Sequence, residues 1–505
     1  MSPRTLLGVA TALTVLAFTS AFRQARAPDT PLTDRPTAVP GDGYASSSSC
    51  RACHPSQYDT WRRSYHWTMT QPATPETVRA DFDGARVAGV QDQPMLLTRK
   101  GNELWAEFED PDRARTDDGQ SRIERQVVMV TGSHHQQVYW YATGRSRLLG
   151  QLPGTYLLAE RRWIPRPSTF LRPPDDRRVS ETGRWNGVCI NCHTTHGKPT
   201  LAAPLGEVPS SAQVAGTTVA EFGIACEACH GPAEAHVRAN RNRSANPSST
   251  VRESTIVQPR RLNPRLSSQV CGQCHSVWEF RDAAAERQAN AQGFPYRPGD
   301  DLTRTRLVVQ PATSQDAPAL RALVASYPQF LADSFWPDGM IRVSGREYNG
   351  LIDSPCYKNA REERRTLSCF SCHTLHKTPE DPRTTAQWAD THQLSGNGNG
   401  DDNCLLCHEK LRARPAAHTH HLPASSGSSC INCHMPHTTY GLLKALRSHQ
   451  ISSPSVAASV NTGRPNACNL CHLDRRCTGP PRVSNPGMGR LNRCSPTNSA
   501  PSRPR

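Results

Sequence analysis

Residues 50–54 read CRACH: two cysteines flank two other residues, and a histidine follows directly. Taken alone, C-x-x-C fits zinc ligands, a redox-active dithiol pair or a covalent haem attachment site. One copy cannot separate these alternatives, so the rest of the chain has to do so.

The same five-residue pattern occurs eight times in the 505 residues, and it uses 16 of the 19 cysteines. We number the copies motifs 1 to 8 in chain order. Their cysteines are Cys50 and Cys53, Cys189 and Cys192, Cys226 and Cys229, Cys271 and Cys274, Cys369 and Cys372, Cys404 and Cys407, Cys430 and Cys433, and Cys468 and Cys471. Their histidines are His54, His193, His230, His275, His373, His408, His434 and His472. A pattern repeated this often reflects one chemical requirement.

Covalent haem attachment explains this pattern best. Two thiols spaced by two residues can form thioethers with the two vinyl groups of one porphyrin, while the adjacent histidine binds the iron from one face. Zinc sites pair one C-x-x-C with another or with a spaced pair of histidines, and eight short C-x-x-C disulfide loops would staple a chain of this size poorly. The sequence therefore predicts eight covalently bound haem c groups, with zinc and disulfides as weaker alternatives.

The chain opens with a pattern typical of a secretion signal over residues 1–27. Arg4 precedes an apolar run from about Leu6 to Phe18, and small residues follow. The run is too short to cross a bilayer comfortably. We therefore expect a cleavable signal peptide and a periplasmic or other extracytoplasmic location, with an uncleaved membrane anchor as the alternative. Cysteine-rich chains are at home outside the cytoplasm.

The net charge of +15 would by itself suggest an acidic partner such as nucleic acid. The propionates of eight haems would cancel this charge, and arginine suits them because its fork of donors matches a carboxylate. No basic motif interleaved with aromatic residues is present. We therefore expect no nucleic-acid partner.

Spacing and composition divide the chain into haem-rich and motif-free parts. Strand-like alternation in segments such as LLTRKGNELWAEFED, residues 96–110, predicts a β-rich insert, and a helix is expected around residues 317–334. The expected parts are a signal at 1–27, a Pro/Ser/Thr-rich linker at 28–48, a first haem segment at 49–81, the β-rich insert at 82–178, a three-haem segment at 179–275, a connecting region at 276–368, a four-haem segment at 369–475 and a disordered tail at 476–505.

Composition points to a fold that relies on its cofactors. Hydrophobic residues make up 36% of the chain and it has 42 prolines, so ordinary side-chain burial is thin. We predict mostly short α-helices and loops wrapped around stacked c-type haems, with the small β-rich insert after the first motif as the exception.

Twelve histidines lie outside the motifs, enough to give every iron a second imidazole ligand. Three of them extend a motif to C-x-x-C-H-x-x-H and could bind a neighbouring haem, namely His196, His376 and His437. His66, His236 and His449 are further candidates. One of His134 and His135, and one of His418, His420 and His421, would complete a set of eight. Of these we name His134 and His421, and His392 is left over as a solvent-facing residue.

At this point a family resemblance can be stated. The segment CRACHPSQYDTWRRSYH, residues 50–66, resembles the C-x-x-C-H-x-x-x-Y-x-x-W-x-x-S-x-H opening of cytochrome c-554-type haem domains, with Trp61 and His66 matched and Ser64 before Tyr65 and His66. TGSHHQQVYWY, CEACHGPAEAH, FWPDGMIRVSGREYNGLIDSPCYK, SSCINCHMPH and RPNACNLCHLD are similar to segments of large secreted multihaem cytochromes that share that domain. The resemblance spans nearly all of residues 45–475 and implies an octahaem, secreted c-type cytochrome.

Two functions fit such a chain. Irons with two histidine ligands have no open position, so closely spaced haems of this kind would carry electrons between redox partner proteins, such as other cytochromes or a membrane quinol-oxidising complex. The alternative is an oxidoreductase of the hydroxylamine-oxidising or nitrite-reducing type, in which one haem keeps an open face for a small nitrogen or sulfur compound. For this alternative, an open haem is most expected at His54 or His275, beside the long motif-free stretches.

Overall fold

The structure is a computed structural model that describes residues 34–112, 122–171, 181–245, 256–358, 366–396 and 400–473, together with 475–476 and 495–496. All eight motifs lie inside these ranges. The predicted signal at 1–27 lies outside the described residues, as does nearly all of the tail that was predicted to be disordered.

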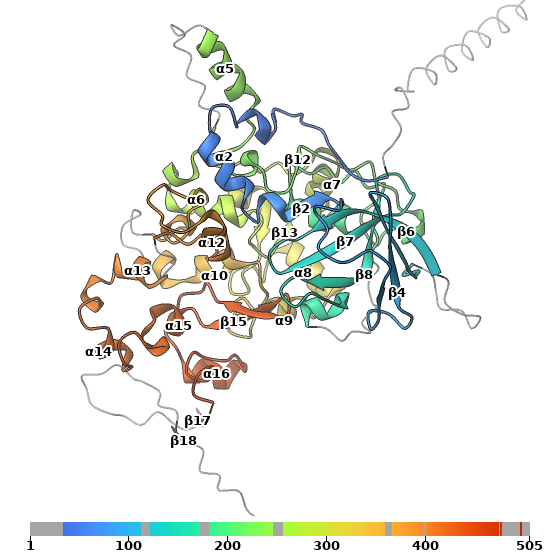
Figure 1. Cartoon of the computed structure of the whole chain (residues 1–505). Coiled ribbons are helices and arrows are strands. Elements are labelled where there is room, and N and C mark those ends of the chain that lie inside the picture. The colour runs from blue at the N-terminus through green and yellow to red at the C-terminus, as the bar shows by residue number, and fades with distance from the viewer. Residues whose placement is uncertain are drawn as a thin grey trace, which may run out of the picture.

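A single antiparallel sheet dominates the part of the chain between motifs 1 and 2 (Figure 1). Its strands follow chain order from β3 to β9. The last residues of β6, Met129–Thr131, extend past the part that pairs with β5, and β2 pairs with them. The strands are β2 (Thr70–Pro72), β3 (Ala85–Val87), β4 (Met95–Lys100), β5 (Glu103–Glu109), β6 (Arg122–Thr131), β7 (Gln136–Ala142), β8 (Leu149–Leu157) and β9 (Arg162–Pro165). A sizeable β-rich region therefore exists where the sequence predicted one.

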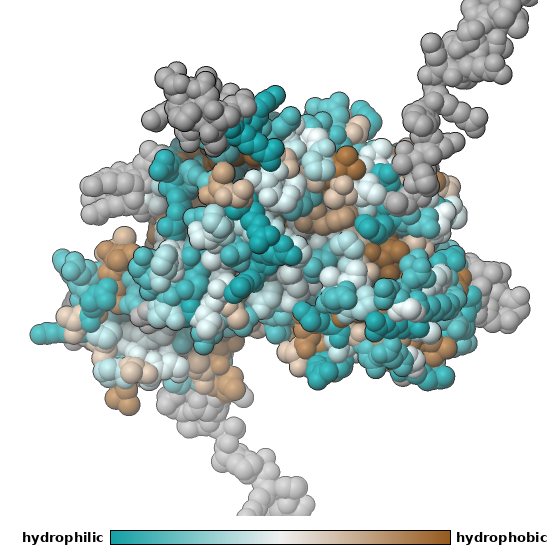
Figure 2. Space-filling view, turned by 45° about the horizontal axis from the view of Figure 1, so that its top comes forward, coloured by the Kyte–Doolittle hydropathy of each residue, from teal (hydrophilic) through white to brown (hydrophobic). Residues whose placement is uncertain are grey.

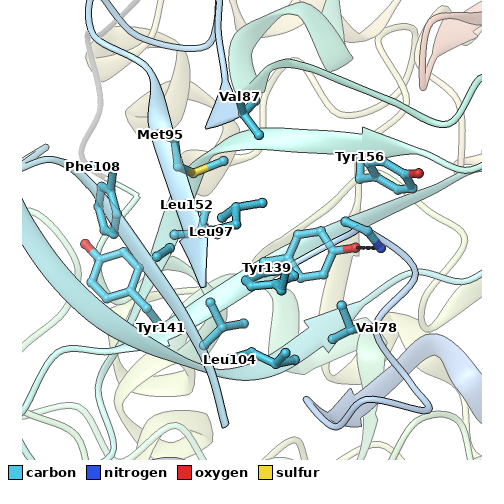
Figure 3. Close-up of a cluster of buried hydrophobic side chains, with 14 of the residues drawn as sticks. Val78, Val87, Met95, Leu97, Leu104, Phe108, Tyr139, Tyr141, Leu152 and Tyr156 are labelled. Carbon is cyan, nitrogen blue, oxygen red and sulfur yellow. Dashed lines mark hydrogen bonds between the residues drawn. The ribbon is translucent and has the colours of Figure 1, made fainter. Parts of the chain in front are cut away.

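The side chains of β7 alternate between the two faces of this sheet, as the period of a strand requires. Tyr139 and Tyr141 point into a core that they share with residues of the neighbouring strands, among them Leu97 and Leu152 (Figure 3). The hydroxyl of Tyr139 accepts a hydrogen bond from the backbone N–H of Ala80 at 3.2 Å. In this core the apolar side chains of the sheet bury one another.

The opposite face of β7 holds the three-haem part of the chain against the sheet. Val138 and Trp140 pack there with Trp185 and with Ile190, which is one of the two residues between the cysteines of motif 2. Trp185 and Ile190 are fully buried. Motif 2 is therefore fixed to the sheet by an apolar contact that needs no haem.

Residues 34–48 do not form the unpacked linker that their composition predicted. β1 (Thr37–Ala38) pairs in parallel with β11 (Thr218–Val219), and Tyr44 is buried. The carboxylate of Glu227 accepts the backbone N–H groups of Ala45 and Ser46 at 2.8 and 2.9 Å. The reason for the difference is that a carboxylate inside motif 3 supplies the hydrogen bonds that the linker's own side chains do not.

Short helices and two-stranded ribbons make up the rest of the body. The helices up to residue 396 are α2 (Pro55–Arg62), α3 (Ile190–His193), α4 (Cys226–His230), α5 (Glu234–Ala245), α6 (Pro264–Gly272), α7 (Ala283–Gln292), α8 (Pro318–Ser326), α9 (Phe330–Ser334), α10 (Glu347–Asp353), α11 (Pro355–Lys358) and α12 (Thr385–Asp390). The ribbons pair β10 (Thr194–Thr195) with β12 (Glu221–Phe222) and β13 (Trp278–Phe280) with β14 (Arg306–Val308).

The helix expected around residues 317–334 is two helices, α8 and α9. They are separated at Tyr327, which precedes Pro328, and a residue before proline is disfavoured in the helical region. Both helices pack into a small apolar core with Val277, Val309 and Ile341.

Residues 400–473 form a C-terminal lobe at one end of the molecule, drawn in orange in Figure 1. The lobe contains α13 (Gly400–Leu405), α14 (Pro415–Thr419), α15 (Cys430–His434), β15 (His437–Gly441), β16 (Lys444–Arg447) and α16 (Val456–Thr462). Figure 2 shows apolar residues at the surface of this end, and Leu406, Leu422 and Leu473 are 74%, 79% and 84% exposed. Beyond it, β17 (Arg475–Arg476) pairs with β18 (Ser495–Pro496).

Within the described part of the chain, none of the helices combines the length and the apolar character needed to cross a bilayer.

Candidate functional site

Every motif folds as one turn of helix, either inside a short helix or as a tight turn. In motifs 1 and 5, for example, the backbone N–H of His54 and of His373 donates to the carbonyl of the first cysteine of the same motif at 2.9 Å. Positions i, i+3 and i+4 of a helical turn lie on one side. Both thiols and the imidazole of each motif are therefore presented together, as a covalently attached haem requires.

All cysteines of the motifs are free thiols, as is Cys356. No disulfide joins the described cysteines, and their thiols are available for thioether bonds.

Thiols of different motifs meet in three places. Cys50 lies within hydrogen-bond reach of Cys226, Cys192 of Cys274, and Cys271 of Cys369. Sharing a hydrogen bond raises the pKa of one thiol in each pair and lowers that of the other, and Cys50 and Cys226 are an example. These contacts bring motif 1 to motif 3, motif 2 to motif 4, and motif 4 to motif 5, although the paired motifs are far apart in sequence.

Five motif histidines each face one histidine from outside the motifs, with the two rings inclined by 33° or less. The ring centres are 6.5 Å apart for His54 and His236, 6.4 Å for His230 and His376, 6.4 Å for His373 and His449, 6.1 Å for His434 and His418, and 6.0 Å for His472 and His421.

These separations fit a metal ion held between two imidazoles. Imidazole nitrogens bind metals at about 2.0–2.1 Å, so two rings on opposite sides of one ion have centres roughly 6 Å apart. Rings that stack in direct contact lie closer, as His134 and His135 do at 3.8 Å. The separation repeats in five places that share no other local structure, so one geometric cause accounts for all of them.

The hydrogen bonds of these rings leave the nitrogen needed for a metal. The Nδ1–H of His230 donates to the carbonyl of Val257 at 2.7 Å, and that of His373 to the carbonyl of His392 at 2.8 Å. His434, His421 and His449 bond backbone carbonyls in the same way. A proton on Nδ1 makes Nε2 the free electron-pair donor, which is the tautomer of a metal-ligating histidine.

His275 of motif 4 differs because its Nδ1 contacts a carboxylate, Oε2 of Glu347, at 2.7 Å. Burial acts to raise the pKa of Glu347, but the contact with His275 holds that pKa below its usual range. Burial acts to lower the pKa of His275, and the contact with Glu347 raises it above its usual value. A carboxylate behind a ligating imidazole increases its basicity. An iron bound to His275 would therefore have the strongest imidazole donor among those described here.

The remaining predicted second ligands do not face a motif histidine at this separation. His66 is close enough to His275 and His373 for their charges to interact, and burial lowers the pKa of His66 to about 4, so it is neutral at pH 7. His134 stacks on Tyr65 at 4.0 Å and contacts His392 at 5.5 Å. The Nδ1 of His437 bonds the carbonyl of Ala445 at 3.0 Å.

His196 is committed elsewhere. Its Nε2 lies 2.9 Å from a carboxylate oxygen of Asp42, and its ring stacks on Tyr44 with centres 4.5 Å apart. Its Nδ1 is buried and has no hydrogen-bond partner among the described residues, and no described motif histidine faces its ring. The C-x-x-C-H-x-x-H pattern therefore does not have the same consequence at motif 2 as at motif 5, where His376 faces His230.

The sequence led us to expect a single ligand among His418, His420 and His421, whereas the structure gives two of these residues ring partners. His420 ends α14 in the left-handed region with φ of 57°, which turns the chain so that His418 and His421 reach different motifs. A cluster of three histidines in four residues was the available signal.

The open haem that the enzyme alternative placed at His54 is not supported by this geometry, because His236 faces His54.

Comparisons with known proteins agree with this description. The sequence model of the cytochrome c552 family matches residues 172–310, a segment that contains motifs 2, 3 and 4. The matching family is thus cytochrome c552, and the likeness of residues 50–66 to cytochrome c-554 stays a prediction. A search of curated proteins gives no match.

Two solved structures are similar to this chain. The crystal structure of the outer cell wall cytochrome OcwA aligns over 85% of this chain and 84% of its own, with 16% identity and a TM-score of 0.50. The octaheme sulfite reductase MccA of Wolinella succinogenes, form II, aligns over 83% of this chain and 59% of its own, with 14% identity and a TM-score of 0.33, which is too low to argue from. The first comparison indicates a shared fold.

The repeated C-x-x-C-H motifs, the match of residues 172–310 to the cytochrome c552 family and the fold shared with OcwA together support a multihaem c-type cytochrome.

Proposed function

We propose that the chain carries eight covalently bound haem c groups, one at each motif, and passes electrons along them between redox partner proteins. The observation that carries this proposal is the set of five histidine pairs with ring centres 6.0–6.5 Å apart. In each pair the motif histidine is the ligand on one face of an iron, and the second histidine is the ligand on the other.

Filled coordination sites favour electron transfer over chemistry on a substrate. An iron with imidazole on both faces has no position for another ligand, so it can change its oxidation state and do little else. The protein then sets each potential through burial and through the hydrogen bonds of the ligands, such as the carboxylate behind His275.

The contacts between motifs support a continuous route. Thiol contacts link motif 2 to motif 4 and motif 4 to motif 5. His376, which follows motif 5, faces the histidine of motif 3, and His236, which follows motif 3, faces that of motif 1. A segment that binds one haem and supplies a ligand to the next fixes the distance between the two porphyrins. One branch of the route therefore runs 2–4–5–3–1.

A second branch leads into the C-terminal lobe. Cys404 of motif 6 is close enough to Cys372 of motif 5 and to Cys430 of motif 7 for the thiolate charges to interact. Cys433 of motif 7 is likewise close to Cys468 of motif 8. The lobe would thus offer an entry or exit point for electrons at the far end of the molecule.

An extracytoplasmic location fits this role. The expected signal over residues 1–27 would export the chain to the compartment where haem c is attached, and the similar protein OcwA is titled an outer cell wall cytochrome. Partners would be other cytochromes or a membrane quinol-oxidising complex that present an exposed haem edge.

Removing one second ligand from the holoprotein tests the proposal. His236→Ala leaves His54 without its partner, so we expect one haem to change from low-spin to high-spin in electron paramagnetic resonance, with the haem content unchanged. His392→Ala is the matched control, because His392 faces no motif histidine and its ring is exposed. An unaltered spectrum for His236→Ala, or the same change in both variants, would refute the ligand assignment.

A further inference from the structure

We propose that the iron at motif 2 keeps one face open for a small anionic ligand. This proposal rests on the proposed function, since it assumes haem at all eight motifs. It comes from a count of the imidazoles available to each motif. All 20 histidines lie within the described residues, so the count omits none.

Three motif histidines, His193, His275 and His408, have no facing ring among the described residues at the separation that the other five share. For His275 a partner is at hand. His66 is close to His275 and His373, and because His373 already faces His449, His275 is the one that His66 is free to serve.

His408 also has candidates nearby, in its own lobe. His420 and His437 face no motif histidine, and the Nδ1 of His437 bonds a backbone carbonyl, which leaves its Nε2 free as in the paired rings. The side chains of His408 and His437 are both exposed, so the ring of either can turn without disturbing a core.

His193 has no such candidate. His134 and His135 stack on each other and His134 contacts His392, and none of these three histidines is among the groups that act on His193. The nearest spare imidazole in sequence is His196. Its Nε2 is hydrogen-bonded to Oδ2 of Asp42, and Nζ of Lys198 forms an ion pair with the same oxygen at 2.5 Å. The charged groups that act on His193 are Arg346 and the ligand histidine of motif 4, His275. Neither can bind an iron at motif 2, because an arginine stays protonated and His275 belongs to another haem.

The hydrogen bonding of His193 is also unlike that of the paired rings. Its Nδ1 is buried and has no hydrogen-bond partner in the part of the chain that the structure describes, whereas the Nδ1 of His230 or His373 donates to a carbonyl. An imidazole without such a partner is the weaker donor to a metal. Motif 2 therefore combines a weaker first ligand with a missing second one.

The charges around motif 2 indicate which ligands it would take. Arg346 acts on both Cys192 and His193, and Arg306 acts on Cys192 as well. Arg306 is 2% exposed and lies over the ring of Trp278 at 4.2 Å, so its charge is poorly screened by water. On Cys189 of the same motif, Arg184 and Arg166 act against one carboxylate, that of Glu181, so the charged groups that act on motif 2 are mostly cationic and favour an anion.

Electron paramagnetic resonance of the oxidised holoprotein, taken alongside its intact mass, tests the proposal with nitrite as the anionic probe. We expect a mass with eight haems, one high-spin haem per chain and seven low-spin ones, and a shift of the high-spin signal when nitrite is added. Eight haems with an entirely low-spin spectrum would overturn the inference and leave the proposed function standing, whereas a mass without haem would overturn both. A response to neutral hydroxylamine but not to nitrite would refute the preference for anions.

Two variants assign the signal to motif 2. His193→Met keeps both thioether bonds and replaces only the first ligand, so we expect it to change the high-spin signal and to leave the seven low-spin haems as they were. His196→Ala should leave the spin count unchanged, since His196 is bonded to Asp42. A gain of one high-spin haem in His196→Ala would show that His196 is an iron ligand, and a high-spin signal that survives unchanged in His193→Met would place the open haem at another motif.

Discussion

The body of the molecule and its C-terminal lobe solve the same problem in different ways. In the body, the imidazoles that face one another come from segments far apart in sequence, as with His54 and His236. Two pairs lie wholly within the lobe, residues 400–473, as with His434 and His418, and a third pair, His373 and His449, joins the body to the lobe. The body also has apolar cores of its own around the sheet, whereas Ala467 and Pro436 are the only buried apolar side chains among the described residues of the lobe.

This difference indicates which part of the chain would need haem in order to fold. In the sheet, apolar side chains bury one another, and burial of this kind contributes roughly 25 cal/mol per Å² without any cofactor. In the lobe, Leu406 inside motif 6 and Leu473 directly after motif 8 are exposed in the polypeptide by itself. Under the proposed function the porphyrin faces would be the apolar surface that covers them, so the lobe should depend on haem for its structure and the sheet should not.

The largest expected effect follows from removing haem from the lobe alone. Replacing both cysteines of each of motifs 6, 7 and 8 with serine prevents both thioether bonds at these motifs. We expect residues 400–473 to lose nearly all protection in amide hydrogen exchange, because folding and cofactor binding are coupled where a preformed core is missing. Protection in β4 to β8 should be unchanged and serves as the internal control. If residues 400–473 kept their protection from amide exchange without haem, the proposed difference between the lobe and the sheet would be wrong.

A smaller effect is expected when the body's own core is damaged. Trp140 is 2% exposed and lies between the sheet and motif 2, and Trp→Ala changes in cores typically cost about 3–5 kcal/mol. Trp140→Ala should lower the free energy of unfolding of the sheet by this amount in urea, measured by tryptophan fluorescence and circular dichroism. Val460→Ala in the lobe is the matched control, since Val460 is 65% exposed and its truncation should cost nothing measurable. Equal losses for the two variants would contradict the proposed division.

The smallest expected effect is a pH dependence that belongs to the body. Burial, with the charge of Glu286 as a second cause, raises the pKa of Glu279 from 4.5 to about 7. A folded state that holds a proton more tightly than the unfolded state is most stable below the unfolded pKa and loses stability as pH rises through the folded one. Stability should therefore fall by about 1–3 kcal/mol between pH 4.5 and 7.

Glu279→Gln should remove this slope, because glutamine cannot ionise. Urea midpoints of the holoprotein taken across this pH range, for the wild type and the variant, provide the measurement. A slope that is the same in both proteins would assign the dependence to other groups.

The sequence was sufficient for features that depend on local patterns. The eight motifs and the β-rich region followed from spacing and alternation, since thiol pairs and strands are both written within a few residues. The break between α8 and α9 was also readable from Pro328, and it was overlooked. The packing of residues 34–48 was not readable, because the carboxylates that hold them, Glu221 and Glu227, lie far along the chain.

The pairing of second ligands was beyond the sequence for the same reason. Identical C-x-x-C-H-x-x-H patterns lead to different partners, because His376 reaches motif 3 whereas His196 meets Asp42, a residue of a segment that was expected to be unpacked. Spacing determines which histidines are near a motif, but long-range folding determines which iron each one can reach.

The account depends most on haem being covalently held at each motif, and the intact mass of the exported, natively produced chain tests this directly. We predict the mass of the mature polypeptide plus eight haems, unchanged after denaturation in acid because thioether bonds persist. A mass equal to the bare polypeptide, or one explained by zinc or by oxidised cysteine pairs, would contradict the account.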